Sequence, residues 1–378
     1  DGCTEEGCLR SVATSFGDYD RDGDLDLFVG SHGYIDPALS QDHQAGGEPS
    51  LLYLNDGDGT FTDASELLPQ ALHDSYTLGG GWIDLDDDGW LDLYSANDVG
   101  HVQPNVVLWN RGGALVYDPE EASGLVISAA NMGLAWGDLN GDLRPDLVIP
   151  AWGELFYLQS VADVGVWVDA TEGAGLQLER PRGPGWGSEL FDIDNDGDLD
   201  LISQFGWLDD KGNPGWVNDQ EQPDVMFINE GTPTDPAFVD LGPQWGLDDR
   251  SANRSVAVVD LNRDGFLDIV KRDLKGSIGV WMSRCDDSGW LRVSLEQPGT
   301  MNQHAVGAKI RIWAGDQLWT RTIRAGGSSM GVGLPPEAHF GLGQRDTIDR
   351  IEIIWPDGVS TRHEHSFTTR QELTIVRP

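Results

Sequence analysis

The stretch Asp18-Tyr-Asp-Arg-Asp-Gly-Asp-Leu-Asp26 occurs, with small changes, five times in this chain of 378 residues. The other copies are Asp84-Leu-Asp-Asp-Asp-Gly-Trp-Leu-Asp92, Asp138-Leu-Asn-Gly-Asp-Leu-Arg-Pro-Asp146, Asp192-Ile-Asp-Asn-Asp-Gly-Asp-Leu-Asp200 and Asp260-Leu-Asn-Arg-Asp-Gly-Phe-Leu-Asp268. Their first residues are 66, 54, 54 and 68 positions apart. A recurrence at this spacing is typical of repeat folds in which each copy belongs to one structural unit.

The residues around each copy predict short β-strands. A run such as Gly79-Gly-Gly-Trp-Ile83 precedes the copy, and an apolar run such as Leu27-Phe-Val29 follows it. Most repeats add a further run such as Leu51–Leu54 and one that ends like Phe61-Thr-Asp63. Four short strands per unit, without helical periodicity, indicate a β-propeller blade. A stacked solenoid is the weaker alternative, because solenoid repeats are usually shorter.

The charge distribution indicates a domain boundary near residue 290. The chain has 64 Asp and Glu against 24 Lys and Arg, a formal net charge of -40. From Trp290 onward there are ten basic and nine acidic residues, so residues 1–289 contain all of the excess acidity. We therefore predict an all-β protein with a β-propeller over residues 1–289, with five visible repeats, and a small β-rich domain over residues 290–378.

This charge also excludes several classes of partner. Nucleic acid is not an expected ligand, because phosphate binding needs clustered cations. An anionic membrane surface is disfavoured for the same reason, and no apolar run reaches transmembrane length. No signal peptide is present, so in an exported protein it would already have been removed. The 39% hydrophobic residues are sufficient for a folded core.

The repeated loop has the chemistry of a calcium site. Carboxylates stand at positions 1, 3, 5 and 9, with Asn at position 3 in two copies; position 7 offers its backbone carbonyl, and Gly at position 6 permits a sharp turn. An oxygen-only ligand set of this density favours Ca²⁺ over Mg²⁺ or zinc. The predicted ligands, for up to five ions, are Asp18, Asp20, Asp22, Asp24, Asp26, Asp84, Asp86, Asp88, Trp90, Asp92, Asp138, Asn140, Asp142, Arg144, Asp146, Asp192, Asp194, Asp196, Asp198, Asp200, Asp260, Asn262, Asp264, Phe266 and Asp268.

The five loops differ in the quality of the predicted site. Asn140 and Asn262 lower the ligand charge of loops three and five, and Leu143 replaces the usual Gly in loop three. Loop three is therefore predicted to be the weakest site. The opening of the loop resembles an EF-hand, but position 12 is not Glu and the flanks are strand-like. The alternative is that the Asp residues only solvate surface turns, and the five copies in register argue against it.

These repeats resemble the FG-GAP/VCBS repeats of integrin-α-like propellers. The motifs Trp290-Leu-Arg-Val-Ser-Leu-Glu296, Asn302–Ile312, His339-Phe-Gly-Leu-Gly343 and Ile354-Trp-Pro-Asp-Gly358 resemble the ASPIC/UnbV domain. Repeats followed by that domain are the layout of the cartilage acidic protein family and its bacterial relatives. The resemblance implies a secreted, calcium-binding propeller. It also implies seven blades where five loops are visible, so the blade count stays open.

Aromatic residues in the long connections are candidates for partner binding. Ser31–Ser50 and Gly206–Asp224 are long, and in a propeller they should lie on the face opposite the calcium loops. The candidate partner-binding residues on this face are Tyr34, His101, Trp152, Trp207 and Trp216. The alternative is that these aromatics fold back for packing. Trp82 and Trp136, at the position of Phe16 in the first repeat, are expected to pack between blades.

The remaining motifs give weak signals. Cys3 and Cys8 are close enough to form a disulfide in an exported chain, with free thiols or a lipidation context as alternatives. Gly327-Ser-Ser-Met-Gly331 matches a hydrolase pattern but lacks the expected strand-to-helix context. We therefore predict a non-catalytic extracellular or periplasmic module that binds a protein or glycan, with adhesion as its role. The alternatives are a propeller-based enzyme and a lectin-like sugar binder.

Overall fold

The computed structural model describes residues 11–33, 46–117, 124–161, 165–179, 182–206, 222–248, 250–274, 276–284, 286–326 and 333–378. Nearly every element in these ranges is a β-strand. The helical elements described are one short helix, α1 (Gly242–Trp245), and two 3-10 turns, η2 (Ser65–Leu67) and η3 (Gln70–Leu72). The predicted all-β class is confirmed.

Five antiparallel sheets follow one another along the chain and form the blades. Blade one contains β1 (Ser11–Gly17), β2 (Asp26–Ser31), β3 (Leu51–Asn55) and β4 (Phe61–Asp63). Blade two contains β5 (Thr77–Ile83), β6 (Asp92–Asn97), β7 (Val106–Asn110) and β8 (Leu115–Tyr117). Blade three contains β9 (Ala135–Gly137), β10 (Asp146–Pro150), β11 (Leu155–Ser160) and β12 (Trp167–Asp169).

The last two blades differ from each other in strand number. Blade four contains β13 (Gly185–Phe191), β14 (Asp200–Phe205), β16 (Val225–Asn229) and β17 (Phe238–Asp240). Within the described residues, blade five contains β19 (Asn253–Val259), β20 (Asp268–Asp273) and β21 (Ile278–Trp281). Between them, β15 (Gln222–Pro223) pairs with β18 (Arg250–Ser251). Every acidic loop connects the first strand of its blade to the second.

The hydrophobic core is divided among the spaces between neighbouring blades. Phe28 and Leu93 belong to one apolar cluster that joins blades one and two, and Leu155 and Phe227 belong to another that joins blades three and four. Further clusters join blades two and three and blades four and five. Strands β5, β6, β7, β10, β13, β14 and β16 are buried along their whole length. Sheets covered on both faces need such continuous burial.

The two end blades each have an uncovered face. Phe16 on β1 is 38% exposed, and Ile278 and Val280 on β21 are 68% and 52% exposed. Strand β1 contacts β5 and β19 contacts β13, but β1 and β19 form no comparable contact among the described strands. Blade one therefore has a neighbouring blade on one side only, and Phe16 stays exposed. Trp82, at the equivalent position of blade two, is 5% exposed, as expected.

The C-terminal strands form a separate, smaller set of sheets. In one, β22 (Gly289–Glu296) lies between β25 (Glu337–Gly343) and β30 (Gln371–Val376), and it pairs with β30 in parallel. The other has the order β24 (Gln317–Thr322), β23 (Lys309–Ala314), β27 (Arg350–Ile354) and β28 (Ser360–His363). A short pair, β26 (Thr347–Ile348) and β29 (Phe367–Thr368), completes them. Buried side chains such as Phe340 and Trp355 form their common core.

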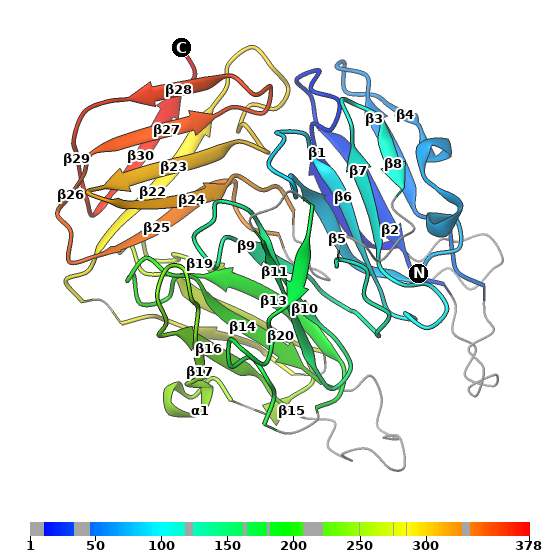
Figure 1. The fold of residues 1–378 in the computed structure, drawn as a ribbon, viewed down its shortest axis with the longest axis horizontal. Helices are drawn as coiled ribbons and strands as arrows, with labels where there is room; N and C mark the ends of the chain where they lie inside the picture. Colours follow the sequence, from blue (N-terminus) through cyan, green and yellow to red (C-terminus); the bar gives the residue numbers. More distant parts are fainter. Residues whose placement is uncertain are drawn as a thin grey trace.

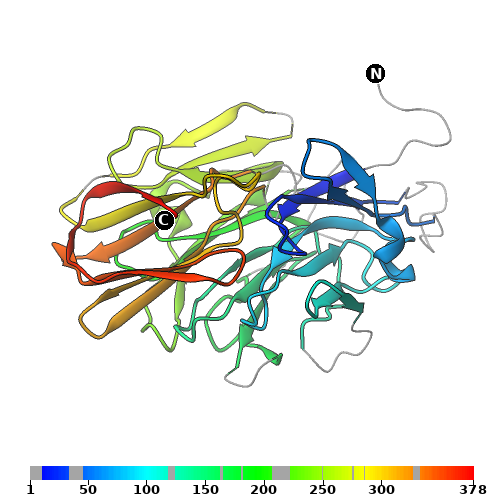
Figure 2. The same ribbon diagram turned by 90° about the horizontal axis from the view of Figure 1, so that it is seen from above.

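This C-terminal domain packs against the acidic loops of the propeller (Figures 1 and 2). Figure 1 shows its orange and red strands beside the loop ends of the blue, green and yellow blades. Glycines at loop position 6 allow the close approach, since a Cβ on Gly265 would lie 1.8 Å from Cε2 of Trp290. At loop four, a Cβ on Gly197 would lie 2.6 Å from Nε1 of Trp319.

Replacing Gly265 with Ala should therefore destabilise the protein by more than backbone strain alone. Gly59→Ala is the matched control, because Gly59 has a similar φ of +92° and no heavy atom within 4 Å of the added Cβ. We expect about 1–2 kcal/mol of strain in both variants. Displacement of Trp290 should add about 1–3 kcal/mol in Gly265→Ala. Urea unfolding measures the difference, and equal effects would contradict the packing of Trp290 on this loop.

Candidate metal centres

The five acidic loops share one backbone conformation. The residues at position 4 all have positive φ: Arg21 +62°, Asp87 +58°, Gly141 +70°, Asn195 +59° and Arg263 +61°. The residues at position 6 do as well: Gly23 +98°, Gly89 +88°, Leu143 +72°, Gly197 +110° and Gly265 +89°. Loop three therefore keeps the turn although its Leu side chain is strained in this region. The repeat seen in the sequence is a repeat of loop structure.

A common hydrogen-bond scheme orients the side chains at positions 3 and 5. In each loop the side-chain oxygen at position 3 accepts the N–H of position 5, as Asp194 does from Asp196 at 3.3 Å. The carboxylate at position 5 accepts the N–H of position 7, as Asp196 does from Asp198 at 2.9 Å. One oxygen of each carboxylate is thus used by the loop. In loops one and four the other oxygen can face a ligand, whereas in loop two Nη1 of Arg111 lies 2.6 Å from Oδ2 of Asp86 and 3.4 Å from Oδ2 of Asp88. In loop three, Oδ2 of Asp142 accepts the hydroxyl of Ser160 at 2.7 Å.

The Asp at position 1 divides its two oxygens in the same way. Oδ2 of Asp192 accepts the N–H of Gly197 at 2.9 Å, and Asp84 and Gly89 form the equivalent bond at 3.0 Å. Oδ1 has no hydrogen-bond partner and is buried in Asp18, Asp84, Asp138 and Asp192. Asp84 and Asp192 are only 6% and 1% exposed. A buried, unpartnered carboxylate oxygen is costly unless a cation is bound to it.

The Asp at position 9 ties its loop to the residue that ends or follows the third strand of the blade. Oδ2 of Asp146 accepts the N–H of Leu139 at 2.9 Å, and Oδ1 accepts the N–H of Ser160 at 2.7 Å. The same two bonds recur at Asp26, Asp92, Asp200 and Asp268. This structural role is additional to the predicted role as a ligand, and it explains why position 9 is Asp in all five copies.

Three loops bring together a compact set of carboxylates. Oxygens of each set lie within 4.8 Å of one another in Asp18, Asp20 and Asp22; in Asp84, Asp86 and Asp92; and in Asp192, Asp194 and Asp200. In loops three and five, the Asn amide donates instead to the carboxylate at position 5, as Asn262 does to Asp264 at 2.8 Å. The lower ligand charge predicted for these two loops is therefore accompanied by an internal hydrogen bond.

Burial raises the pKa of many of these carboxyl groups. It raises the pKa of Asp18 to about 7 and that of Asp26 to about 8, and neighbouring carboxylates add to both shifts. Burial also raises the pKa of Asp138 to about 6 and holds the pKa of Asp192 well above its usual range. Removing water from a carboxylate disfavours its charged form, so these groups favour a proton or a metal ion.

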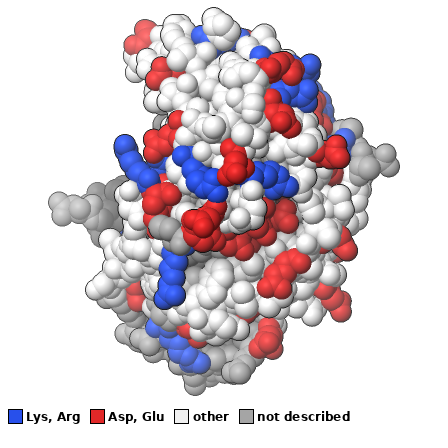
Figure 3. Space-filling view, turned by 90° about the vertical axis from the view of Figure 1, so that its left-hand side faces the viewer, with Lys and Arg blue, Asp and Glu red and all other residues white. Residues whose placement is uncertain are grey.

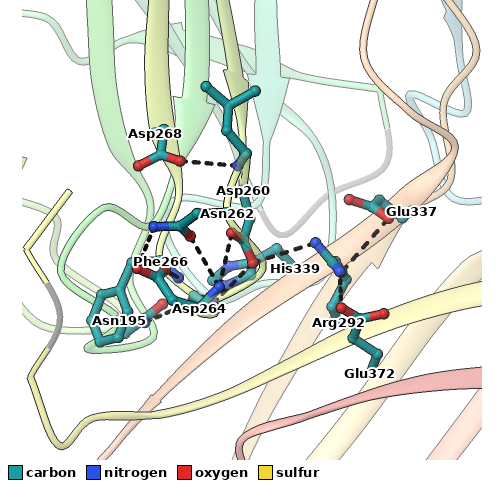
Figure 4. Close-up of polar contacts among 12 residues, drawn as sticks. Asn195, Asp260, Asn262, Asp264, Phe266, Asp268, Arg292, Glu337, His339 and Glu372 are labelled. Carbon is teal, nitrogen blue, oxygen red and sulfur yellow. Dashed lines mark hydrogen bonds and ion pairs between the residues drawn. The ribbon is translucent and has the colours of Figure 1, made fainter. Parts of the chain in front are cut away.

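Basic side chains of the C-terminal domain form ion pairs with the first Asp of two loops. Nζ of Lys309 lies 2.7 Å from Oδ2 of Asp84, and Nη1 of Arg292 lies 3.3 Å from Oδ2 of Asp260. Figure 4 shows Arg292 pointing toward Asp260 of loop five, with Glu337 and Glu372 on its other side. Figure 3 shows Lys and Arg side chains beside Asp and Glu side chains across the middle of the face that it draws. Such pairing compensates part of the negative charge of the loops.

A cavity of about 130 Å³ lies where the C-terminal domain covers the inner strands. Asp84, Asp138 and Asp192 line it from three loops, and Lys309 and Arg321 line it from the C-terminal domain. Glu189 on β13 pairs there with Arg324 at 2.6 Å. The charged groups that line the cavity include carboxylates and cations in comparable number, so the cavity does not select one sign of charge.

The predicted partner face is only partly within the described residues. Tyr34, Trp207 and Trp216 lie outside them, as do Cys3, Cys8 and Cys285. Trp152 packs against the buried cluster of Leu78, Met132 and Trp186, and it is partly exposed. His101 is exposed in the connection that follows β6. In the same set of connections, Nε2 of His32 lies 3.2 Å from Oδ2 of Asp98, which joins blades one and two.

Sequence reasoning missed the Asn residues that end the third strands. Asn110 is fully buried, and its Nδ2 donates to the carbonyl of Tyr19 in loop one at 2.7 Å. It also donates to the carbonyl of Leu91 at 3.1 Å, so it joins two loops. Asn55 makes the equivalent bond to Leu25 at 3.3 Å. The pattern Asn-x-Gly at residues 55–57, 110–112 and 229–231 is the signal that could have found them.

Comparison with known proteins agrees with this organisation. The model of the FG-GAP-like repeat matches residues 18–95, 84–149 and 192–270, and the model named ASPIC and UnbV matches residues 299–378. Cartilage acidic protein 1 of Homo sapiens is 25% identical over 295 residues, which are 76% of this chain and 42% of that protein. The Xenopus tropicalis protein is 26% identical over the same length, with 76% and 43% covered. The chain thus spans less than half the length of these relatives.

The similar solved structures are more distant. One is an Agrocybe aegerita lectin that recognises non-reducing terminal N-acetylglucosamine, with 17% identity, a TM-score of 0.39, and 70% of this chain and 64% of the lectin covered. Another is a biofilm matrix protein of V. cholerae, with 12% identity, a TM-score of 0.37, and 97% and 62% covered.

No helix among the described residues is long and apolar enough to cross a membrane. The repeated loops, the sheets that they connect and the matched family models agree along most of the sequence. The chain belongs to the family of proteins in which FG-GAP-like repeats are followed by an ASPIC/UnbV domain.

Proposed function

We propose that this protein is a secreted, calcium-stabilised β-propeller that binds an extracellular protein or glycan without catalysing a reaction. The observation that carries the calcium part is the buried Oδ1 atom of the first Asp in loops one to four, which has no hydrogen-bond partner. Four loops leave the same atom unpartnered although the loops share one hydrogen-bond scheme. A divalent cation at this atom would provide the missing partner in each loop.

The ligand chemistry of the loops fits calcium. Loop four offers Oδ1 of Asp192, the free oxygens of Asp194 and Asp196, the carbonyl of Asp198 and the carboxylate of Asp200. These are oxygen ligands only, which suits a hard cation with a high coordination number. The bound ion would supply positive charge and hold the loop in shape. The residues themselves orient the carboxylates through the bonds to positions 5, 6 and 7.

The arrangement of the two domains supports a partner site on the opposite face. The C-terminal domain covers the first Asp of loops such as two and four and leaves less room for a large partner on this face, while Asp88, Asp194 and Asp196 stay exposed. The connections that contain His32, Asp98, His101 and Trp152 lie at the other ends of the blades. Loops on a rigid scaffold commonly provide binding surfaces. The name of the relatives, which refers to cartilage and acidity, supports an extracellular location.

Removal of calcium should lower the melting temperature by several degrees or more, and millimolar Ca²⁺ should restore it, because bound ligand stabilises the native state by mass action.

In saturating Ca²⁺, the double variant Asp194→Asn, Asp196→Asn should have a lower melting temperature and bind one ion fewer than the unsubstituted protein. Glu66→Gln with Asp74→Asn is the control, since both carboxylates are exposed and lie outside the loops. Differential scanning calorimetry and metal analysis measure both effects. An unchanged melting curve in excess chelator would contradict the proposal that calcium stabilises the protein.

The pH dependence of stability should itself depend on calcium. Without divalent ions, the raised pKa values of Asp18, Asp24, Asp26 and Asp138 mean that the folded state binds more protons than the unfolded state. Stability contributed by these groups is complete below about pH 4 and is lost as the pH rises toward 8. The buried His339 acts in the opposite direction, because burial lowers its pKa to about 4 and its contribution is lost as the pH falls.

The melting temperature of ion-free protein should therefore fall by several degrees between pH 5 and pH 8, since four carboxyl groups outweigh one imidazole. With saturating Ca²⁺ the fall should disappear, because the ion replaces the proton on the same carboxylates. Thermal melts at both pH values, with and without Ca²⁺, measure this. A rise in melting temperature between pH 5 and pH 8 in ion-free protein would show that the loop carboxylates are not the dominant titrating groups.

Replacing Trp207 and Trp216 with Ala should weaken binding to the partner and leave the calcium-dependent melting unchanged. Large aromatic side chains in loops often dominate binding energy. Phe61→Ala is the control, because Phe61 is 43% exposed and stands at the turn between β3 and β4, at the loop end of blade one. A glycan array and a panel of extracellular matrix proteins identify the partner class, and a hydrolase panel tests the alternative of an enzyme. An equal loss of partner binding in Phe61→Ala and in the Trp variants would contradict the proposed binding face.

A further inference from the structure

The C-terminal domain binds the loops through their backbone as well as through charge. The N–H of Asn302 donates to the carbonyl of Gly23 in loop one at 3.0 Å, and the N–H of Gly343 donates to the carbonyl of Asn195 in loop four at 2.7 Å. In loop five, Nε2 of His339 donates to the carbonyl of Gly265 at 3.0 Å. All three acceptors stand at positions 4 or 6, where φ is positive. These contacts therefore require the loops to keep the conformation that orients their carboxylates.

The cations of the domain contact the oxygen that the loop itself already uses. Lys309 pairs with Oδ2 of Asp84, the atom that also accepts the N–H of Gly89. Arg292 pairs with Oδ2 of Asp260, which accepts the N–H of Gly265. Oδ1 of Asp84 remains without a partner. The domain thus holds the first carboxylate from one side and leaves the atom on the other side for an ion.

The domain also excludes water from these carboxylates. A Cβ on Gly341 of β25 would lie 2.1 Å from Oδ2 of Asp192 and 2.5 Å from Cα of Asn195, so the strand lies directly on loop four. The same Asp192 is 1% exposed, and its Oδ1 has no partner. Covering a carboxylate is unfavourable unless positive charge lies near it. The buried Arg321 of the same domain supplies part of that charge to Asp192, and an ion at Oδ1 would supply more.

We propose that the C-terminal domain is an ion-dependent lid on the loop face, so that ions in the loops stabilise its docking and its docking raises the affinity of the loops for ions. The coupling is reciprocal by thermodynamic necessity, because both effects are one free energy. Mutation of a residue that binds to a metal ligand, and not to the metal itself, commonly lowers metal affinity by about 10- to 100-fold. This inference rests on the proposed binding of calcium by the loops.

Gly341→Ala tests the lid from the side of the C-terminal domain. The added methyl group should push β25 and loop four apart, while the identity of every ligand and the charge of the chain stay the same. Gly333→Ala is the matched control, because Gly333 lies in the same domain and has no heavy atom within 4 Å of an added Cβ. Leu25→Ala tests the lid from the other side, since Leu25 of loop one packs against the core of the C-terminal domain. It also keeps the test valid should Gly341→Ala unfold that domain, which hydrogen exchange in β23 and β27 would reveal.

Calorimetric titration with Ca²⁺ and small-angle scattering of the full chain provide the two readouts. In the unsubstituted protein we expect chelation to increase the radius of gyration and Ca²⁺ to reverse the increase. Gly341→Ala and Leu25→Ala should weaken calcium binding at least about tenfold at the loop concerned, and should open at Ca²⁺ concentrations that keep Gly333→Ala closed. Calcium binding with an unchanged radius of gyration would overturn the lid, as would opened variants with unchanged affinity. Absence of calcium binding in the unsubstituted protein would instead overturn the proposed function.

Discussion

Repulsion among aspartate carboxylates at one end of the propeller is the constraint on which the rest of the structure depends. Each loop turns tightly, so that the side-chain oxygens at positions 3 and 5 accept the backbone N–H groups of the residues two positions later. This turning collects the charges instead of separating them, and burial removes screening water from the first Asp of loops one, two, four and five. The available sources of compensation are backbone N–H groups, Arg111 of blade two, the cations of the C-terminal domain and the proposed ions.

The nearly neutral C-terminal domain complements the acidic propeller in this respect. Its ten basic residues are few, but Lys309 and Arg292 each reach the first Asp of a loop, and Arg324 reaches Glu189 on an inner strand. The position-9 aspartates serve a different purpose, because their two oxygens join the loop to the end of the third strand of the same blade. Asp at position 9 thus stabilises its own blade, and Asp at position 1 contributes to the contact between the two domains.

Much of this organisation could be predicted from the sequence because it is local. The loops, their spacing and the strand after each loop follow from short patterns around Asp18 or Asp192, and the structure has strands at those places. Contacts between distant residues could not be predicted in the same way. Nothing near Lys309 indicates that it reaches Asp84, which lies in the second repeat. The exposure of Phe16 also depends on a neighbouring blade and not on its own repeat.

Blade five ends at β21, whose outer edge has no partner strand among the described residues. Its exposed Ile278 and Val280 make this edge a site where copies of the protein could pair strand to strand. A net charge of -40 opposes such pairing, because like-charged molecules repel one another before their edges meet. Dissolved salt shortens the range of that repulsion to about 8–10 Å at physiological ionic strength. We therefore expect the solubility of this protein to depend on ionic strength and on the charge that its loops leave uncompensated.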